Sequence, residues 1–441
     1  MKIWLEEIKT VFKECDDFFL QHDYLYNQPV ILFGLSTLID IPQTKKLIEI
    51  NLNMPKYSLQ EVIDHHLVKV AREQNNIIDA ILEGKIILYI PDFEKYMIME
   101  VISKSLNRSI ELPTNENVIQ DALDSFIEDI DTNIGIIRKH FRTKFLITKV
   151  ISTGIEQEKK IALLGLEAHV NQNLMRKIET QLKEKHDQEI HNAQSLVKTL
   201  GFSAWDIVPK YKSTEIPTEV IASLKKGKVV LIIDDFPFAL IFPNFLWDMF
   251  TTENERNLPI PLMLFIRVLR VIGVIVATLM PGLYVALVSV NPEVLQLELG
   301  LSIAQSREGV PYPALVEVLM MLVILELILE ASVRLPKSIG PTLTMVGGII
   351  LGQAIISAKL VSNLLTIVVA GTTIANATVV GIQNHLMLRL LKYVIVILAA
   401  IYGVLGIIVG TVLICAYFAS INVYGISYLD YQVSKDESNN G

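Results

Sequence analysis

The sequence has 441 residues, 51% hydrophobic and 20% charged, with a formal net charge of −8. This acidic balance, and the lack of a basic stripe interleaved with aromatic residues, excludes nucleic acid as an expected partner. The two cysteines, Cys15 and Cys415, lie far apart in the chain, so we expect no disulfide between them and a reducing compartment.

Charge separates the chain into two halves. Residues 1–256 hold 30 lysines and arginines and 38 acidic residues, whereas residues 257–441 hold nine of each sign and are strongly apolar. The amino terminus is charged throughout, so we expect no signal peptide. The fold class we predict is an α/β cytoplasmic part made of two duplicated subdomains, followed by an all-α membrane domain with several spans.

The first half contains a repeated pattern. Residues 30–48 and 161–179 each give an apolar strand, a Gly-Leu pair, a loop and an amphipathic helix; residues 81–99 and 223–242 each give a helix end, Gly-Lys and two β-rich strands. Gly84 and Gly227 suit helix C-caps that lead into strands. We therefore predict α/β subdomains over 1–110 and 145–256, joined by a helical linker over 111–144 with a helix across 117–141.

Catalytic motifs are missing from this half. The strand and acids "VVLIIDD" at 229–235 would need a GxxxxGK[ST] phosphate loop for nucleotide hydrolysis, and the sequence contains none. The Asp-His-His run at 64–66 has no third or fourth metal ligand at a useful spacing. We expect no enzyme activity, no metal and no cofactor.

The second half predicts a membrane domain over 257–425, with a polar tail over 426–441. Five apolar segments are long enough or nearly long enough to span a bilayer: 264–288, 313–333, 341–358, 360–381 and 393–418. The third is short and rich in glycine, so a full span, a broken helix and a re-entrant segment all stay open. Basic clusters near the first, second and fifth spans then fall on one side, which places the first half in the cytoplasm and the tail outside.

The second predicted span carries charge. Glu326, Glu330 and Arg334 recur every four residues on one helix face, and Glu317 lies toward the opposite end. Charged groups inside a membrane need protein, an ion or water beside them. Glu330 pairing with Arg334 and Glu326 bonding to a neighbouring helix is one reading. A wet conduction path or an ionic ring between subunits is the other.

A break precedes that span. Residues 291–306 have leucines at helical spacing and could form a helix in the membrane interface. Prolines at 311 and 313 then end any helix, and we interpret Arg307, Glu308, Gly309 and Pro311 as a hinge. The simplest role for Arg307 and Glu308 is a local ion pair.

Small residues mark the third and fifth segments. Gly348 with Gly352, and Gly406 with Gly410, are spaced for close helix packing. The third segment also aligns apolar and polar side chains on one stripe, which resembles a hydrophobically gated pore lining: Val346, Ile350, Gln353 and Ser357. Five spans are too few to enclose a wide aqueous path, so conduction would favour a ring of subunits.

Several stretches resemble a known family. Residues 265–293, 303–321 and 331–362, with the orders Arg-Glu-Gly-x-Pro and Arg-x-Pro-x-x-x-Gly-Pro, are similar to the A-subunit family of bacterial spore germinant receptors, the GerA type. The resemblance implies a non-enzymatic receptor component in the spore inner membrane, with a transporter-like B subunit and a C lipoprotein as partners. It also implies oligomerisation and release of monovalent cations when nutrient arrives, through a pore helix around Val346 to Gln353.

Three functions are compatible with these patterns. The first is the A subunit of a nutrient-gated cation channel that triggers germination. The second is a secondary transporter, which broken helices with glycine and proline would suit. The third is a membrane-anchored sensor or scaffold that binds a small ligand between its two cytoplasmic subdomains.

Overall fold

The computed structural model describes residues 3–25, 28–44, 46, 68–69, 74–93, 95–99, 124–336 and 339–430. These residues form two compact units. The sheet unit contains the chain up to Asp206 together with Lys210–Asn244, and the helical unit contains Ile207–Pro209 and Phe245–Asp430. The Asp-His-His run at 64–66 lies outside the described residues.

The first half of the sheet unit is an antiparallel sheet of strand order β1-β2-β4-β5-β3. Its isoleucine-rich central strand β4 is buried on both faces, which explains its continuous apolar run. Helices α1 and α4 belong to the same core as this sheet. The elements are α1 (Ile3–Val11), β1 (Phe18–Leu25), β2 (Gln28–Leu35), β3 (Val68–Lys69), α4 (Gln74–Leu82), β4 (Ile86–Ile90), a 3₁₀ turn (Pro91–Phe93) and β5 (Lys95–Met99).

The second half repeats this arrangement with strand order β6-β7-β9-β10-β8. Position for position, this is the order of the first sheet, as the duplication predicts. The structure thereby confirms an α/β region with two sheets. The elements are α5 (Ile130–His140), β6 (Leu146–Thr153), β7 (Lys159–Leu166), α6 (Gln172–Glu184), α7 (Ala193–Thr199), β8 (Lys212–Thr214), α8 (Pro217–Lys225), β9 (Val229–Ile233) and β10 (Ala239–Phe242).

The paired glycines have the same backbone role in both halves. Gly84 follows α4 with a φ of 82°, and Gly227 follows α8 with a φ of 78°. This left-handed conformation ends a helix at little cost only for glycine. At Gly227 a Cβ atom would also collide with the carbonyl oxygen of His169. The two positions therefore turn each helix into the strand that follows it.

The two halves of the sheet unit are joined by buried polar contacts. Arg138 of α5 donates from Nε and Nη2 to the two carboxylate oxygens of Asp17 at 2.5 and 2.6 Å, and both side chains are 3% exposed. Burial alone would lower the pKa of Arg138, but the Asp17 carboxylate outweighs burial and raises that pKa. Beside this pair, Cys15 forms a parallel bridge with Thr148 of β6.

The linker helix is shorter than predicted. Residues 124–129 are not helical, and α5 begins only at Ile130. Asp129 causes this start, because its carboxylate accepts a hydrogen bond from the Thr132 backbone N–H at 2.8 Å and so caps the helix. The prediction of a helix across 117–141 is therefore wrong for 124–129, while residues 117–123 lie outside the described residues.

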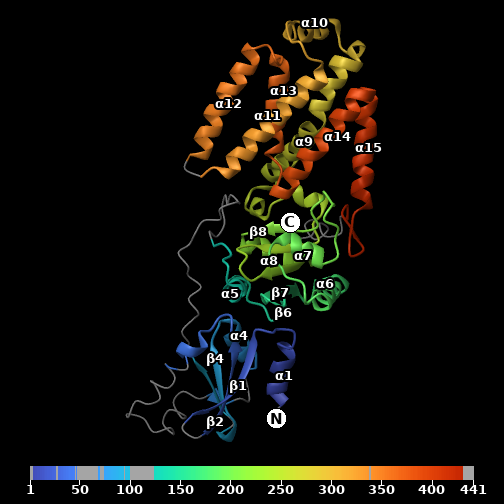
Figure 1. The fold of residues 1–441 in the computed structure, drawn as a ribbon. Coiled ribbons are helices and arrows are strands. Elements are labelled where there is room, and N and C mark those ends of the chain that lie inside the picture. Colours follow the sequence, from blue (N-terminus) through green and yellow to red (C-terminus); the bar gives the residue numbers. More distant parts are fainter. Residues whose placement is uncertain are drawn as a thin grey trace. The chain divides into compact units, whose positions relative to one another are not determined.

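In the helical unit, two 3₁₀ turns at Leu246–Met249 and Glu253–Asn257 precede the first long helix. Within the described residues, three helical segments are long and apolar enough to cross a membrane: 260–290, 340–357 and 382–402. The elements are α9 (Ile260–Val285) with a π-helical extension (Ala286–Val290), α10 (Leu297–Ser306), α11 (Ala314–Arg334), α12 (Gly340–Ser357), α13 (Asn363–Asn376), α14 (Ile382–Tyr402) and α15 (Val404–Ser420), before a short hairpin of β11 (Asn422–Val423) and β12 (Ile426–Ser427) (Figure 1).

The segment 393–418 is two helices and not the single span predicted. Gly403, with a φ of 62°, ends α14 and caps α15. A Cβ atom at Gly403 would collide with Asn291, whose Oδ1 accepts a hydrogen bond from the Val404 N–H at 3.1 Å. The glycine thus permits both the reversal and the close approach of Asn291. α15 then packs back against α14.

This reversal changes the expected position of the tail. Tyr428, after α15, accepts a hydrogen bond from the Leu246 N–H at 3.0 Å, and Met249 accepts one from the Val380 N–H at 3.1 Å. We call this end of the helical unit, where α9 begins, the proximal end, and the opposite end, near Asn291 and α10, the distal end. Tyr428 therefore lies at the proximal end and does not follow a fifth continuous crossing, while residues 431–441 of the predicted tail lie outside the described residues.

Candidate functional site

Helix α12 is the least covered of the span-length helices. Only 12% of its apolar window is buried, against 44% for α9 and 33% for α14. Its buried apolar side chain is Ile355, near the distal end. The predicted pore-lining residues all lie on its exposed surface: Val346, Ile350, Gln353 and Ser357.

The two glycine pairs differ in what they contact. A Cβ atom at Gly348 or Gly352 would meet nothing within 4 Å, so the expected close packing of α12 is not found among the described residues. A Cβ atom at Gly410 would come within 2.7 Å of Ile395, and one at Gly406 would collide with the Leu398 carbonyl oxygen. The structure thus places Gly406 and Gly410, but not Gly348 and Gly352, at a helix contact.

A buried charge cluster lies at the distal end. We call it the Glu317 cluster; it consists of Tyr284 of α9, Arg307 after α10, Glu317 of α11 and Ser362 before α13. Glu317 is 0% exposed, and its Oε1 accepts a hydrogen bond from the Ser362 N–H at 2.6 Å. The Ser362 hydroxyl contacts the Tyr284 hydroxyl at 2.9 Å and caps α13 by accepting from Leu365 N–H.

Arg307 pairs with a different glutamate than expected. Its Nε lies 3.3 Å from Glu317 Oε2, and its Nη2 donates to the Tyr312 carbonyl at 3.0 Å. The simple reading of a local Arg307–Glu308 pair is therefore wrong. Burial explains why Arg307 pairs with Glu317 and not with Glu308. The buried Glu317 carboxylate has no solvent to stabilise its charge and gains far more free energy from a nearby cation than the exposed Glu308 carboxylate does. Gly309 (φ 87°) makes the turn that follows, and Pro311 precedes α11.

A second cluster joins α11 to α14. Glu326 forms ion pairs with Arg389 and with Lys392, the latter at 3.2 Å between Nζ and Oε1. All three side chains are less than a quarter exposed. Glu326 therefore contacts a neighbouring helix, which was one of the two sequence-based readings of this face.

The remaining charges of that face are at the surface. Arg334 donates from Nε to Glu330 Oε1 at 2.9 Å, and their side chains are 78% and 59% exposed. The stripe of Glu326, Glu330 and Arg334 is thus divided: its inner member faces α14, and its outer pair lies at the proximal end of α11.

Sequence reasoning missed the partners of these acids. Ser362 carried a usable signal, because a serine directly before an apolar helical run is a typical N-cap. Arg389 and Lys392 were interpreted only as flanking positive charges, although their spacing of three places both on one face of an apolar helix. Tyr284 gave no signal, since aromatic residues are common in membrane spans.

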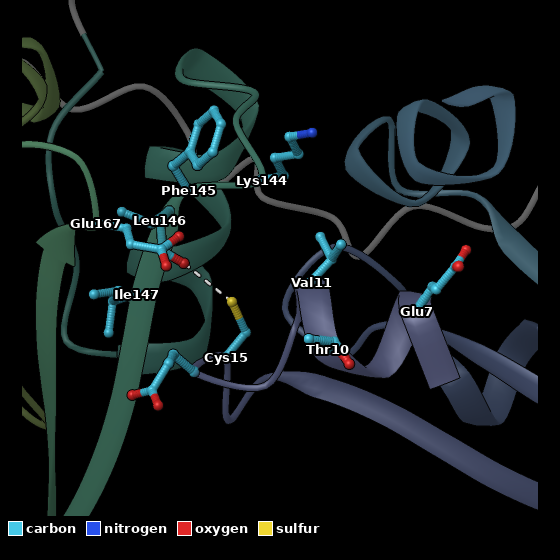
Figure 2. Close-up of a pocket in the computed structure, with 10 residues that line it drawn as sticks. Glu7, Thr10, Val11, Cys15, Lys144, Phe145, Leu146, Ile147 and Glu167 are labelled. Carbon is cyan, nitrogen blue, oxygen red and sulfur yellow. Dashed lines mark hydrogen bonds between the residues drawn. The ribbon is translucent and has the colours of Figure 1, made fainter. Parts of the chain in front are cut away.

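The sheet unit contains a cavity of about 450 Å³ where α1 meets β6 (Figure 2). Phe145, Ile147 and Val11 supply apolar walls, and Cys15 donates from Sγ to the Leu146 carbonyl at 3.0 Å. Burial raises the pKa of the Cys15 thiol. The charged residues that line the cavity are mostly acidic: Glu7, Glu14, Lys144 and Glu167. In the described part of the chain, no group of three or more His, Cys, Asp or Glu side chains could hold a metal ion.

A profile of the Bacillus/Clostridium GerA spore germination protein family matches residues 6–439. The chain belongs to this family. It is a germinant receptor A subunit, and the family is not one of enzymes. The receptor subunit is a membrane protein with an N-terminal soluble region and several apolar helices.

Individual relatives agree with this assignment. The subunit is 32% identical over 353 residues to spore germination protein GerLA of Bacillus cereus, covering 80% of this chain and 72% of the relative. It is 30% identical over 414 residues to spore germination protein A1 of Bacillus subtilis (strain 168), covering 93% and 83%. The crystal structure of the N-terminal domain of the A subunit of the Bacillus megaterium spore germinant receptor GerK3 matches with a TM-score of 0.38 and 16% identity, over 54% of this chain and 92% of that domain.

Proposed function

We propose that this A subunit assembles into a ring in the spore inner membrane and forms a nutrient-gated path for monovalent cations that triggers germination. The N-terminal part lies in the cytoplasm, and a transporter-like B subunit and a C lipoprotein are its partners, as the family resemblance implies. In this proposal α12 lines the path, Val346 and Ile350 form a hydrophobic constriction, and Gln353 and Ser357 supply polar groups beside it.

The bare surface of α12 carries this proposal. An apolar helix at the edge of a membrane protein can face lipid, but α12 also exposes the amide of Gln353 and the open glycines Gly347, Gly348 and Gly352. Lipid satisfies no hydrogen bond of an amide, whereas water or a neighbouring subunit does. Small residues without an intrachain partner are the usual means by which a second helix approaches closely.

The ion-pair geometry suits a path outside the single chain. Glu317 and Glu326 are both neutralised by cations inside the helical unit, so neither leaves a charged lining between the helices of one chain. We therefore expect a conducting surface between chains, and closed cyclic symmetry is the usual way for identical subunits to enclose one.

Planar-bilayer recording of the purified full-length chain, with mass photometry of the same sample, tests the proposal. We expect an oligomer that passes monovalent cations, and we expect Val346→Ala to raise the basal leak about tenfold, which equals about 1.4 kcal/mol of barrier. Val412→Ala is the matched control, because Val412 is a similarly exposed valine on α15. A monomer without conductance, or equal leak in both variants, contradicts the proposal.

A second function, recognition of a small ligand by the sheet unit, is favoured by one observation. The lining of the cavity between α1 and β6 combines apolar side chains with mainly acidic charged ones, a chemistry that suits an amphiphilic amine. Calorimetry of the full-length chain with amino acids that differ in side-chain size would test it. Glu167→Gln should weaken a genuine complex, and heats that do not depend on this substitution would reject the cavity as the binding site.

A further inference from the structure

We propose that Arg307 and Glu317 are positioning residues that fix the distal end of α12 through Ser362 and thereby limit basal conduction. The inference rests on the proposed function for its second half, the link to conduction. Its first half concerns the position of a helix inside one chain and stands on the contacts of the Glu317 cluster alone.

α12 is held near its two ends. Among its residues whose burial is described, Gly340 at the proximal end and Ile355 at the distal end are buried. Ile355 packs in a core with Val361 and Leu365, which follow α12, and with Val318 of α11. Between these ends the described side chains are half-buried or exposed. Residues 355–362 are therefore the most buried attachment of α12 in the described part of the chain.

The Glu317 carboxylate holds the segment 355–362 in place. Glu317 Oε1 accepts from the Ser362 backbone N–H at 2.6 Å, three residues after the Lys359 turn, where φ is 54°. A hydrogen bond from a backbone N–H to a buried carboxylate is charge-assisted and stronger than one between neutral groups. Ser362 is also the N-cap of α13, so the carboxylate fixes the point at which the chain turns from α12 into the next helix.

The Arg307 guanidinium compensates the buried charge of the Glu317 carboxylate. Glu317 is fully buried, and neither its Oε2 nor the Arg307 Nε has a hydrogen-bond partner, although the two atoms are 3.3 Å apart. The attraction is thus mainly that of charge to charge. Without the guanidinium, the ionised carboxylate would have no compensating cation inside the protein, which is strongly unfavourable.

The hinge that carries Arg307 also contacts the turn at Lys359. A Cβ atom at Gly309 would come within 2.7 Å of the Lys359 side chain, so the segment carrying Arg307 lies directly against the turn after α12. A displacement of α10 or of this hinge changes both contacts together. The Glu317 cluster therefore couples the distal surface of the helical unit to the end of α12.

The test measures the position of α12 and conduction separately. Spin labels at Ser357→Cys and Tyr402→Cys report the distance between the distal ends of α12 and α14, in a Cys415→Ser background because Cys415 is exposed whereas Cys15 is buried. Labelled chains are diluted into unlabelled ones so that only distances within a chain are observed. Cation flux is measured in liposomes with unlabelled chains that carry the same Arg307, Arg334 or Glu317 substitution but keep Ser357 and Tyr402.

Arg307→Gln is the main variant and Arg334→Gln its matched control, since each removes the cation beside one glutamate of α11. We expect Arg307→Gln to broaden and shift the distance distribution and to raise basal flux about tenfold, within the usual range of couplings between sites. Arg334→Gln should change neither. Adding Glu317→Gln to Arg307→Gln should restore both readouts toward wild type, because the amide oxygen can still accept from Ser362 N–H with no charge left unpaired.

The outcomes separate the two halves of the proposal. A wild-type distance distribution in Arg307→Gln overturns it entirely. A shifted distribution with unchanged flux in a conducting protein overturns the link to conduction. If neither wild type nor any variant conducts and the distance distribution of Arg307→Gln is still shifted, the positioning role stands and the proposed function is overturned. If Arg307→Gln does not fold, Glu317→Leu serves as the second variant, because leucine cannot accept a hydrogen bond from the Ser362 N–H. An unchanged distance distribution in that variant overturns the inference.

Discussion

Helices α12 and α14 are both apolar and long enough to span a membrane, yet they differ in how far other parts of the chain cover them. α14 buries Leu391, Ile395, Val396 and Ala399 against its neighbours, whereas α12 buries Ile355 near one end. Composition does not explain the difference, because both are rich in large aliphatic residues. α14 is thus held by its own chain, whereas most of the described surface of α12 is not covered by the other described residues.

The largest effect is expected where a glycine of the α14–α15 contact is enlarged. Gly406→Leu places a side chain against the backbone of Leu398 and Ala399, which cannot move away as a flexible side chain could. We expect about 3 kcal/mol less free energy of unfolding, the upper part of the usual range for overpacking, measured by denaturant titration in micelles.

Gly348→Leu is the counterpart on α12. Nothing lies within 4 Å of a Cβ atom there, so the monomer should unfold as wild type does, while oligomer formation should weaken. Equal destabilisation by the two substitutions would remove the distinction between the helices.

An intermediate effect is expected at the charge cluster that ties α11 to α14. Glu326→Gln leaves Arg389 and Lys392 without their carboxylate in a setting less than a quarter exposed. We expect a loss of about 2 kcal/mol of unfolding free energy, below the value for a fully buried pair. Glu330→Gln, on the same helix, should stay within about 0.5 kcal/mol because its pair with Arg334 is exposed. A reversed order would mean that α11 is held by its surface and not by α14.

The smallest effect is expected at the turn between α14 and α15. Asn291→Ala removes the acceptor for the Val404 N–H and should cost about 1 kcal/mol, the usual value of one hydrogen bond. Hydrogen exchange at Val404 should rise with it. Unchanged protection at that amide would show that Gly403 alone makes the turn.

The sequence was sufficient for features set by local patterns. The repeated Gly-Lys-strand units predicted two related subdomains, because Gly84 and Gly227 must take left-handed backbone that few other residues accept. Continuous apolar composition, which is also a local signal, predicted the span-length helices α9 and α12. Each of these signals is contained within about twenty residues, so no distant contact was needed to read it.

Features set by distant contacts could not be read in this way. The break at Gly403 depends on Asn291, 113 residues before Val404, and glycine by itself does not break a membrane helix. The choice of Glu317 over Glu308 by Arg307 depends on burial that Ser362 and Tyr284 complete. The exposure of Val346 and Gln353 follows from which helices pack together, and apolar composition cannot distinguish a helix facing its own chain from one facing another.

Cysteine modification at Gln353 tests most directly whether α12 lines an aqueous path. In the Cys415→Ser background, a membrane-impermeant cationic thiol reagent is applied to Gln353→Cys during bilayer recording, with Val412→Cys on α15 as the exposed control. Our account predicts that the current falls on modification of position 353 and stays constant with position 412. An unchanged current through conducting Gln353→Cys channels would contradict this account. Mass spectrometry would then show either that the reagent does not reach position 353 or that it reacts there without affecting conduction.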